Sequence, residues 1–186
     1  MSQHDRYISP FSTRYASDEM QYIFSDDNKF RTWRRLWVAL ARAEMEQGLT
    51  NITPEMVAEL EAHVDDINYE VAIEREKLVR HDVMSHVYAY GLQCPKAKGI
   101  IHLGATSCYV TDNADLIIYR EALRYLEKEL KAAMRILGFA DVVEVAIGAD
   151  LCTVEEAHDF LEEVPEKLDW MGTSCCPAWS MMAKTL

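Results

Sequence analysis

Long apolar runs are missing from this sequence. No stretch approaches the length of a membrane span, and the polar start, Met-Ser-Gln-His-Asp-Arg, lacks the apolar core of a signal peptide. An excess of basic residues is missing too, because 19 Lys and Arg stand against 31 Asp and Glu, a formal net charge of −12. This charge disfavours nucleic acid and anionic membranes as partners, although a local basic site could still bind a small anion. We therefore expect a cytoplasmic protein that binds neither nucleic acid nor a membrane.

A disulfide framework is also missing. The sequence has five cysteines, and two of them, Cys175 and Cys176, are adjacent, which fits a reducing compartment better than paired bridges. With 186 residues, 49% of them hydrophobic and 27% charged, the chain can form one ordinary domain or two small ones around a packed core.

Helical periodicity, rather than strand alternation, runs through the first 130 residues. Apolar side chains three and four residues apart predict a helix from Lys29 to Gln47 that Gly48 ends, and shorter helices over 54–63, 70–78 and 87–92. The polar and aromatic residues before this region are expected to form an extended arm. Three arginines are expected on the solvated face of the first helix, with a small-anion site as the alternative: Arg31, Arg34 and Arg35.

The stretch 99–115 joins a glycine-punctuated turn to the longest helical pattern, which starts at Ser107 and passes Leu130. Thr106 and Ser107 stand where this helix begins, so their hydroxyls could cap it and its free N–H groups could hold an anion. The alternative is a well-capped helix start without a ligand. A heptad pattern that needs partner helices predicts a bundle, and its members are Leu116, Tyr119, Leu123, Leu126, Leu130, Ala133 and Leu137.

The pattern changes near Ile136. A β-branched run between Gly138 and Gly148 predicts a strand, and a capping box that starts at Thr153 predicts a short helix ending at Glu163. We thus expect a mainly α fold with a short α/β tail. Its expected parts are an N-terminal helical domain over 1–106, the start of a long bundle helix over 107–135, and the tail over 136–186.

Histidine and its neighbours supply the candidate chemistry. His81 lies between Arg80 and Asp82, and such an imidazole can be oriented by the carboxylate while the guanidinium binds a phosphate or carboxylate. The alternative is a helix start at Asp82 with incidental neighbours. His81 and His86 are five residues apart and do not share a helix face as a metal-binding pair would. His102, in an apolar run, is expected to be a hydrogen-bonded core histidine.

Four segments, in order along the chain, resemble the adenylosuccinate lyase family of the fumarase/aspartase superfamily. They are RYAS, FRTWRRLWVALARAE, RHDVMSH and GIIHLGATSCYVTDNADL. The resemblance covers about residues 10–131. It implies an all-α homotetramer with active sites shared between subunits. Without a cofactor, that family releases fumarate from adenylosuccinate and from the succinyl-carboxamide intermediate of purine synthesis.

The resemblance also implies substrate-binding roles for seven residues. They are Arg14 and Tyr15 at the nucleotide phosphate, the triplet Arg80, His81 and Asp82, and Thr106 and Ser107 at the succinyl carboxylate. An elimination also needs a general acid and a general base. The family carries these as a histidine in a GFTHxQ-type segment and a serine in an SSAMPYK-type loop. Neither segment occurs in this sequence, so the isolated chain is expected to lack turnover.

The tail, about residues 136–186, resembles a piece of the catalytic domain of iron-only hydrogenases, whose first cluster motif is TSCCP. This resemblance implies a proton-relay role for Cys175 and an iron–sulfur ligand role for Cys176. A [4Fe–4S] cluster needs four thiolates, and the family's other cysteine motifs do not occur here. We therefore expect the cluster not to assemble and both cysteines to be idle, without hydrogenase activity.

Taken together, the two resemblances predict a chimera whose junction lies near Lys131–Arg135. Three accounts stay open. The chain is an inactive lyase fragment that still binds a nucleotide, a rearranged or mispredicted product without any activity, or a helical module that self-associates through the heptad pattern.

Overall fold

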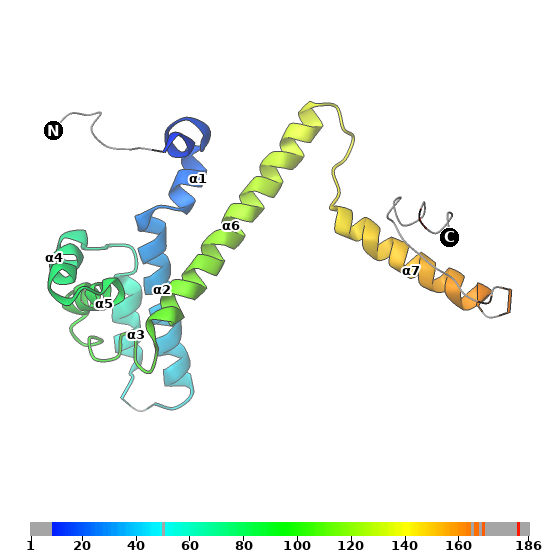
Figure 1. Ribbon diagram of the computed structural model, residues 1–186. Helices are drawn as coiled ribbons and strands as arrows, with labels where there is room; N and C mark the ends of the chain where they lie inside the picture. Colours follow the sequence, from blue (N-terminus) through cyan, green and yellow to red (C-terminus); the bar gives the residue numbers. More distant parts are fainter. Residues whose placement is uncertain (1–8, 50, 165, 168, 170–181, 183–186) are drawn as a thin grey trace. The chain divides into compact units, whose positions relative to one another are not determined.

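The structure is a computed structural model that describes residues 9–49, 51–164, 166–167, 169 and 182. The described residues are mainly helical, as the sequence predicts (Figure 1). The chain divides into two compact units, Met1–Glu129 and Leu130–Leu186. The division of the sequence at 106 and 135 stays a prediction. In the described parts of the chain, no helix is long and apolar enough to cross a membrane.

The first unit opens with a π-helical turn, η1 (Phe11–Tyr15), and a short helix, α1 (Asp18–Ile23). The prediction of an extended arm is therefore wrong over these residues. Ser17 fixes the start of α1, because its hydroxyl oxygen accepts the backbone N–H of Met20 at 3.2 Å. The same hydroxyl lies 2.9 Å from the Tyr125 hydroxyl and so ties the segment to the long helix.

Helix α2 (Asp26–Glu46) confirms the predicted helix over 29–47. Ser25 caps its first turn, and Gly48, at φ 90°, lies beyond its end. Trp33 and Trp37 project from α2 into the main core, where both are buried. Burial of side chains this large stabilises the unit by roughly 2–3 kcal/mol each.

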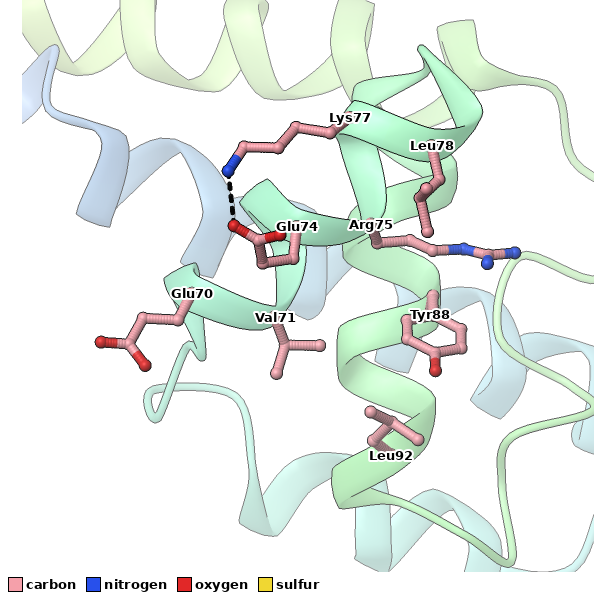
Figure 2. A pocket seen from close by; sticks show the side chains of 8 residues that line it. All are labelled: Glu70, Val71, Glu74, Arg75, Lys77, Leu78, Tyr88 and Leu92. Atoms are coloured by element: carbon pink, nitrogen blue, oxygen red, sulfur yellow. Dashed lines mark hydrogen bonds and ion pairs between the residues drawn. The ribbon is translucent and has the colours of Figure 1, made fainter.

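Helices α3 (Pro54–Ala62), α4 (Tyr69–Val79) and α5 (Asp82–Gln93) follow. The first two lie within one residue of their predicted bounds, and α5 starts five residues earlier than predicted. Helices α4 and α5 pack against each other, and Figure 2 shows side chains of both around one pocket.

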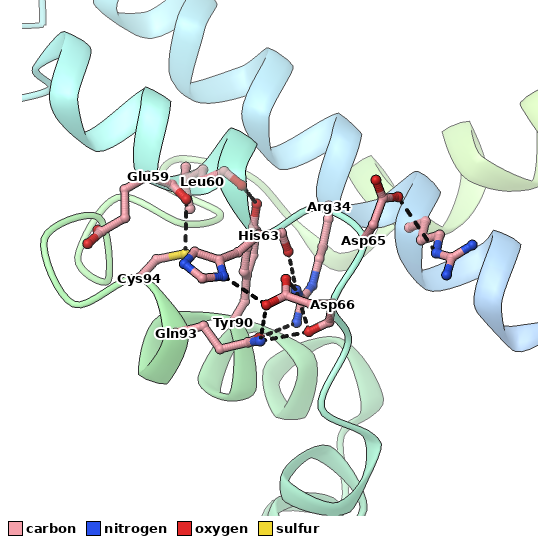
Figure 3. Close-up of polar contacts among 10 residues, drawn as sticks. Arg34, Glu59, Leu60, His63, Asp65, Asp66, Tyr90, Gln93 and Cys94 are labelled. Carbon is pink, nitrogen blue, oxygen red and sulfur yellow. Dashed lines mark hydrogen bonds and ion pairs between the residues drawn. The ribbon is translucent and has the colours of Figure 1, made fainter.

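Arg34 is buried, with 1% of its surface exposed, which corrects the prediction of a solvated side chain. Its guanidinium donates to the backbone oxygens of His63 and Asp66 and to Gln93 Oε1, and it stacks on the Tyr90 ring (Figure 3). Burial lowers its pKa, but arginine stays charged in proteins. The guanidinium therefore fastens the α3–α4 connection and α5 onto α2.

The long helix α6 (Ser107–Ile136) has two apolar faces. One packs onto the first unit through small and β-branched residues, namely Val110, Ala114, Ile118 and Ala122. The members of the predicted heptad pattern from Leu116 to Ala133 form the other face and are all exposed, and Leu137, also exposed, follows the end of the helix. A helical surface of this kind calls for partner helices, so the bundle stays a prediction.

In the second unit, helix α7 (Val145–Glu163) occupies part of the predicted strand, so that prediction is wrong. Thr153 lies inside α7 rather than at a helix start, and its hydroxyl donates to the Ala149 carbonyl at 2.9 Å. No strand occurs among the described residues of this unit, so its expected α/β character is not found there. A β-branched run without a partner strand among the described residues cannot pair its backbone N–H and C=O groups in a sheet, whereas a helix pairs them within the segment.

Candidate functional site

The turn between α4 and α5 carries the triplet Arg80, His81 and Asp82. Arg80 ends α4 in the left-handed conformation at φ 53°, which for a non-glycine residue costs on the order of 1 kcal/mol. His81 is extended and caps α5, whose first residue is Asp82. Because the chain reverses over two residues, all three side chains are exposed on one turn.

His81 joins this turn to the start of α6. Its Nε2 lies 3.3 Å from the hydroxyl oxygen of Ser107, although 26 residues separate the two in sequence. Its Nδ1 accepts the backbone N–H of Met84 at 3.4 Å, so a neutral ring carries its proton on Nε2 and donates it to Ser107. Asp82 Oδ1, 3.6 Å from Nδ1, becomes an ion-pair partner if the ring is protonated. The structure thus brings two of the predicted segments together.

The loop before α6 is held in an unusual conformation beside His81. His102 has φ 66° and Gly104 has φ 63°, so two left-handed residues lie within three positions. His102 Nδ1 accepts the indole N–H of Trp37 at 3.0 Å, which confirms the expectation of a hydrogen-bonded histidine. Burial lowers the pKa of His102, and its electrostatic interaction with the nearby His81 ring lowers it further. This strained loop leads into Thr106 and Ser107, at the positive end of the α6 dipole.

Arg14 and Tyr15 lie elsewhere in the first unit. Both belong to η1 and are exposed, with 74% of Tyr15 accessible. Among the described residues, no hydrogen bond, ion pair or ring contact joins either of them to the His81–Ser107 pair. The structure therefore assembles the Arg80–Asp82 turn with Thr106 and Ser107 but does not bring in the two residues predicted to contact the phosphate.

An iron–sulfur cluster does not fit the residues of this chain. Cys175 and Cys176 lie outside the described residues, and the tail supplies one further cysteine, Cys152, so its thiolates number fewer than the four that a [4Fe–4S] cluster needs. The described residues hold no group of three metal-binding side chains. Cys94 is buried in the first unit, and burial raises its pKa to about 12, which keeps it protonated and inert.

Sequence reasoning missed Arg75 and Lys98, which lie beside His81 in a pocket. Gly91 is the one local signal in the sequence for this pocket, because a glycine inside a helical pattern often marks a place where another group packs closely against the helix.

Comparison with known proteins gives two separate likenesses. The chain is 52% identical to the adenylosuccinate lyase of Schizosaccharomyces pombe over 132 residues, which are 70% of this chain and 27% of that protein. It is 54% identical to the Saccharomyces cerevisiae enzyme over 124 residues, or 66% of this chain and 26% of that protein. The Pyrococcus abyssi enzyme is 32% identical over 130 residues, or 70% of this chain and 29% of that protein.

The family model described as iron only hydrogenase large subunit, C-terminal domain, matches residues 114–186. This match begins within α6. Because the lyase matches cover about 70% of the chain, they overlap the hydrogenase match in part of that helix. Both resemblances noted in the sequence are thus confirmed. The chain spans about a quarter of the length of the adenylosuccinate lyases that it matches, and over its last 73 residues it is similar to part of an iron-only hydrogenase.

Proposed function

We propose that about residues 10–131 are the N-terminal portion of an adenylosuccinate lyase and bind a nucleotide of the adenylosuccinate or AMP type. The contact between His81 and Ser107 carries the proposal, since it joins two motif segments into one surface. The identity of more than half of the aligned residues with two yeast adenylosuccinate lyases supports it.

Each predicted residue has a role that suits its chemistry. The N-terminus of α6 offers free N–H groups and a positive dipole end to the succinyl carboxylate, with Thr106 and Ser107 as hydroxyl donors. Arg80 adds a guanidinium fork for an oxyanion, and His81 with Asp82 adds a hydrogen-bond donor whose charge can change. Arg14 and Tyr15 contact the phosphate, which requires η1 to approach the turn or to serve a neighbouring subunit's site.

The elimination chemistry itself requires groups that these 186 residues lack. An adenylosuccinate lyase in purine nucleotide biosynthesis takes a proton next to a carboxylate and protonates the leaving nitrogen. Neither the acid nor the base segment of the family occurs here, so the isolated chain binds substrate without converting it. An ultraviolet assay of adenylosuccinate cleavage is expected to show no turnover, and measurable conversion would refute this part of the proposal.

Nucleotide binding is tested by titrating the 186-residue chain with AMP in a calorimeter. The variants Arg80→Ala and His81→Ala are expected to weaken binding by about tenfold each, because each removes a charged or polar partner. Lys96→Ala, which removes an exposed charge elsewhere in the first unit, is the matched control. If AMP does not bind the wild-type chain, the account of a product without activity replaces this one.

The exposed face of α6 supports a second function, self-association. Its apolar side chains, including Leu123 at 66% exposure, form a surface that partner helices would cover. We expect a homo-oligomer, a tetramer if the chain assembles as the full-length family does. Light scattering after gel filtration is expected to show an oligomer for the wild type and for Leu161→Glu, and a smaller species for Leu123→Glu. A monomeric wild type would contradict self-association.

The tail is proposed to be an inactive fused segment. After anaerobic reconstitution with iron and sulfide, we expect less than one cluster per chain, because the donor set is incomplete.

Independent DNA reads across codons 125–140 test the chimera itself. A continuous reading frame would support a genuine fusion, and a break would show that the two parts are encoded separately.

A further inference from the structure

A pocket of about 420 Å³ lies beside His81, between α4, α5 and the segment that follows α5. Its polar lining consists of basic side chains, those of Arg75, His81 and Lys98, together with Tyr88, and none of its lining residues is acidic. This is unexpected in a chain with a net charge of −12. The rest of the wall is apolar and includes Met84 and Val87.

Arg75 is held in position by an aromatic ring, and no carboxylate among the described residues forms an ion pair with it. Its guanidinium carbon lies 4.6 Å from the centre of the Tyr88 ring, and its Nε is buried without a hydrogen bond among the described residues. The carboxylate of Glu74 is 2.5 Å from Lys77 Nζ, and Figure 2 shows this pair extending away from the Arg75 guanidinium. A cation held in this way retains free donors for an external anion.

Lys98 is positioned by a glycine. Gly91 lies inside α5 and is buried, and a Cβ atom at this position would lie 2.9 Å from Lys98 Cγ. The stem of Lys98 therefore rests on the bare backbone of α5, where any larger residue would displace it. Glycine is less stable than alanine inside a helix, so a glycine at this position is consistent with the close packing of Lys98 against it.

We propose that this pocket binds an oxyanion, a phosphate or a carboxylate, carried on a small organic molecule. Arg75 supplies the planar fork, Lys98 a second positive charge, and the wall around Met84 and Val87 the contact for the apolar part of the ligand. His81 lines this pocket, and its Nε2 lies 3.3 Å from the Ser107 hydroxyl, so His81 is common to the pocket and to the site at the start of α6, whereas Ser107 does not line the pocket. The inference stands whether or not the chain binds a nucleotide.

Binding is tested on the full chain by NMR titration with inorganic phosphate and, separately, with succinate. The resonances of the Arg75 Nε–H and the Lys98 amide report on the pocket. We expect saturable shifts at both, and the tighter of the two probes identifies the oxyanion. Arg75→Gln and Lys98→Gln are each expected to weaken binding by about tenfold, as the loss of a charge-assisted hydrogen bond would.

Lys96→Gln is the matched control, because it removes the same charge two residues from Lys98 and is expected to change binding by less than about twofold. Gly91→Ala moves Lys98 without altering any charge and is expected to weaken binding while Arg75 is intact. Absence of shifts at both reporters would overturn the proposal, as would equal weakening in all four variants. Ser107→Ala separates the two sites, because it should reduce AMP binding and leave the response of Arg75 to the tighter probe unchanged.

Discussion

His86 makes the stability of the first unit depend on pH. The imidazole is 6% exposed, stacks on the Phe30 ring with 3.7 Å between ring centres, and meets the edge of Trp33. Burial, together with the positive charge of Arg34, lowers the pKa of His86 from its ordinary value near 6.5 to about 4. The folded unit therefore holds this ring neutral.

The sign and size of the effect follow from proton linkage. Below pH 6.5 the unfolded chain binds a proton at this ring, whereas the folded chain does so only near pH 4. The stability contributed by the neutral ring is thus complete above pH 6.5 and is lost as the pH falls towards 4. At 1.36 kcal/mol for each pKa unit, the loss approaches about 3 kcal/mol.

Urea unfolding followed by tryptophan fluorescence measures this loss at several pH values between 7 and 4. His86→Gln is the reference, because it keeps a polar side chain of similar length but does not titrate, so the difference in slope isolates His86. We expect the wild type to lose about 3 kcal/mol more than the variant over this range. Equal losses in the two proteins would refute the reasoning.

Two further predictions use matched pairs within the first unit. Arg34→Ala is expected to cost about 3 kcal/mol in urea unfolding, because it opens a cavity and removes the donor to the His63 and Asp66 carbonyls. Arg35→Ala, on an exposed side chain, should cost under about 0.5 kcal/mol. Ile118→Ala, on the packed face of α6, is expected to cost about 2 kcal/mol, and Leu123→Ala, on the exposed face, close to zero for a monomer. Similar values within either pair would contradict the assigned burial.

The helices of the first unit could be predicted because their signals are local. Caps such as Ser25 and Thr53, the proline at 54 and the glycine at 48 act within a few residues. The burial of Arg34 could not be predicted, since its partners lie about 30 to 60 residues away on other helices. Patterns of arginine on a helix do not reveal carbonyl groups that tertiary packing brings to them.

Helix α6 shows a second limit of pattern analysis. The heptad pattern gives the strongest hydrophobic signal along this helix in the sequence. The face that packs onto the rest of the first unit is instead built around Ala114, Ile118 and Ala122. Small residues allow close approach of helices but give a weak hydrophobic signal. In the tail, the β-branched residues near Val145 predict a strand, but a helix forms there. The β-propensity of single residues does not depend on whether a partner strand is present.

The candidate site was predicted in its parts but not in its assembly. The sequence identified Arg80 to Asp82 and Thr106 with Ser107, and the structure adds the contact that joins them and the left-handed conformation of Arg80 and His102. A contact across 26 residues depends on how α5 and α6 pack, which no local motif encodes. Arg75 and Lys98 were missed for the same reason.

A double-mutant cycle on His81 and Ser107 tests the central claim most directly, namely that these two residues form one nucleotide-binding surface. The dissociation constant of AMP would be measured for the wild type, His81→Ala, Ser107→Ala and the double variant. We predict that the double variant weakens binding by less than the product of the single effects, with a coupling of about 0.5–1.5 kcal/mol. Strictly additive effects, or variants that bind as tightly as the wild type, would contradict the account.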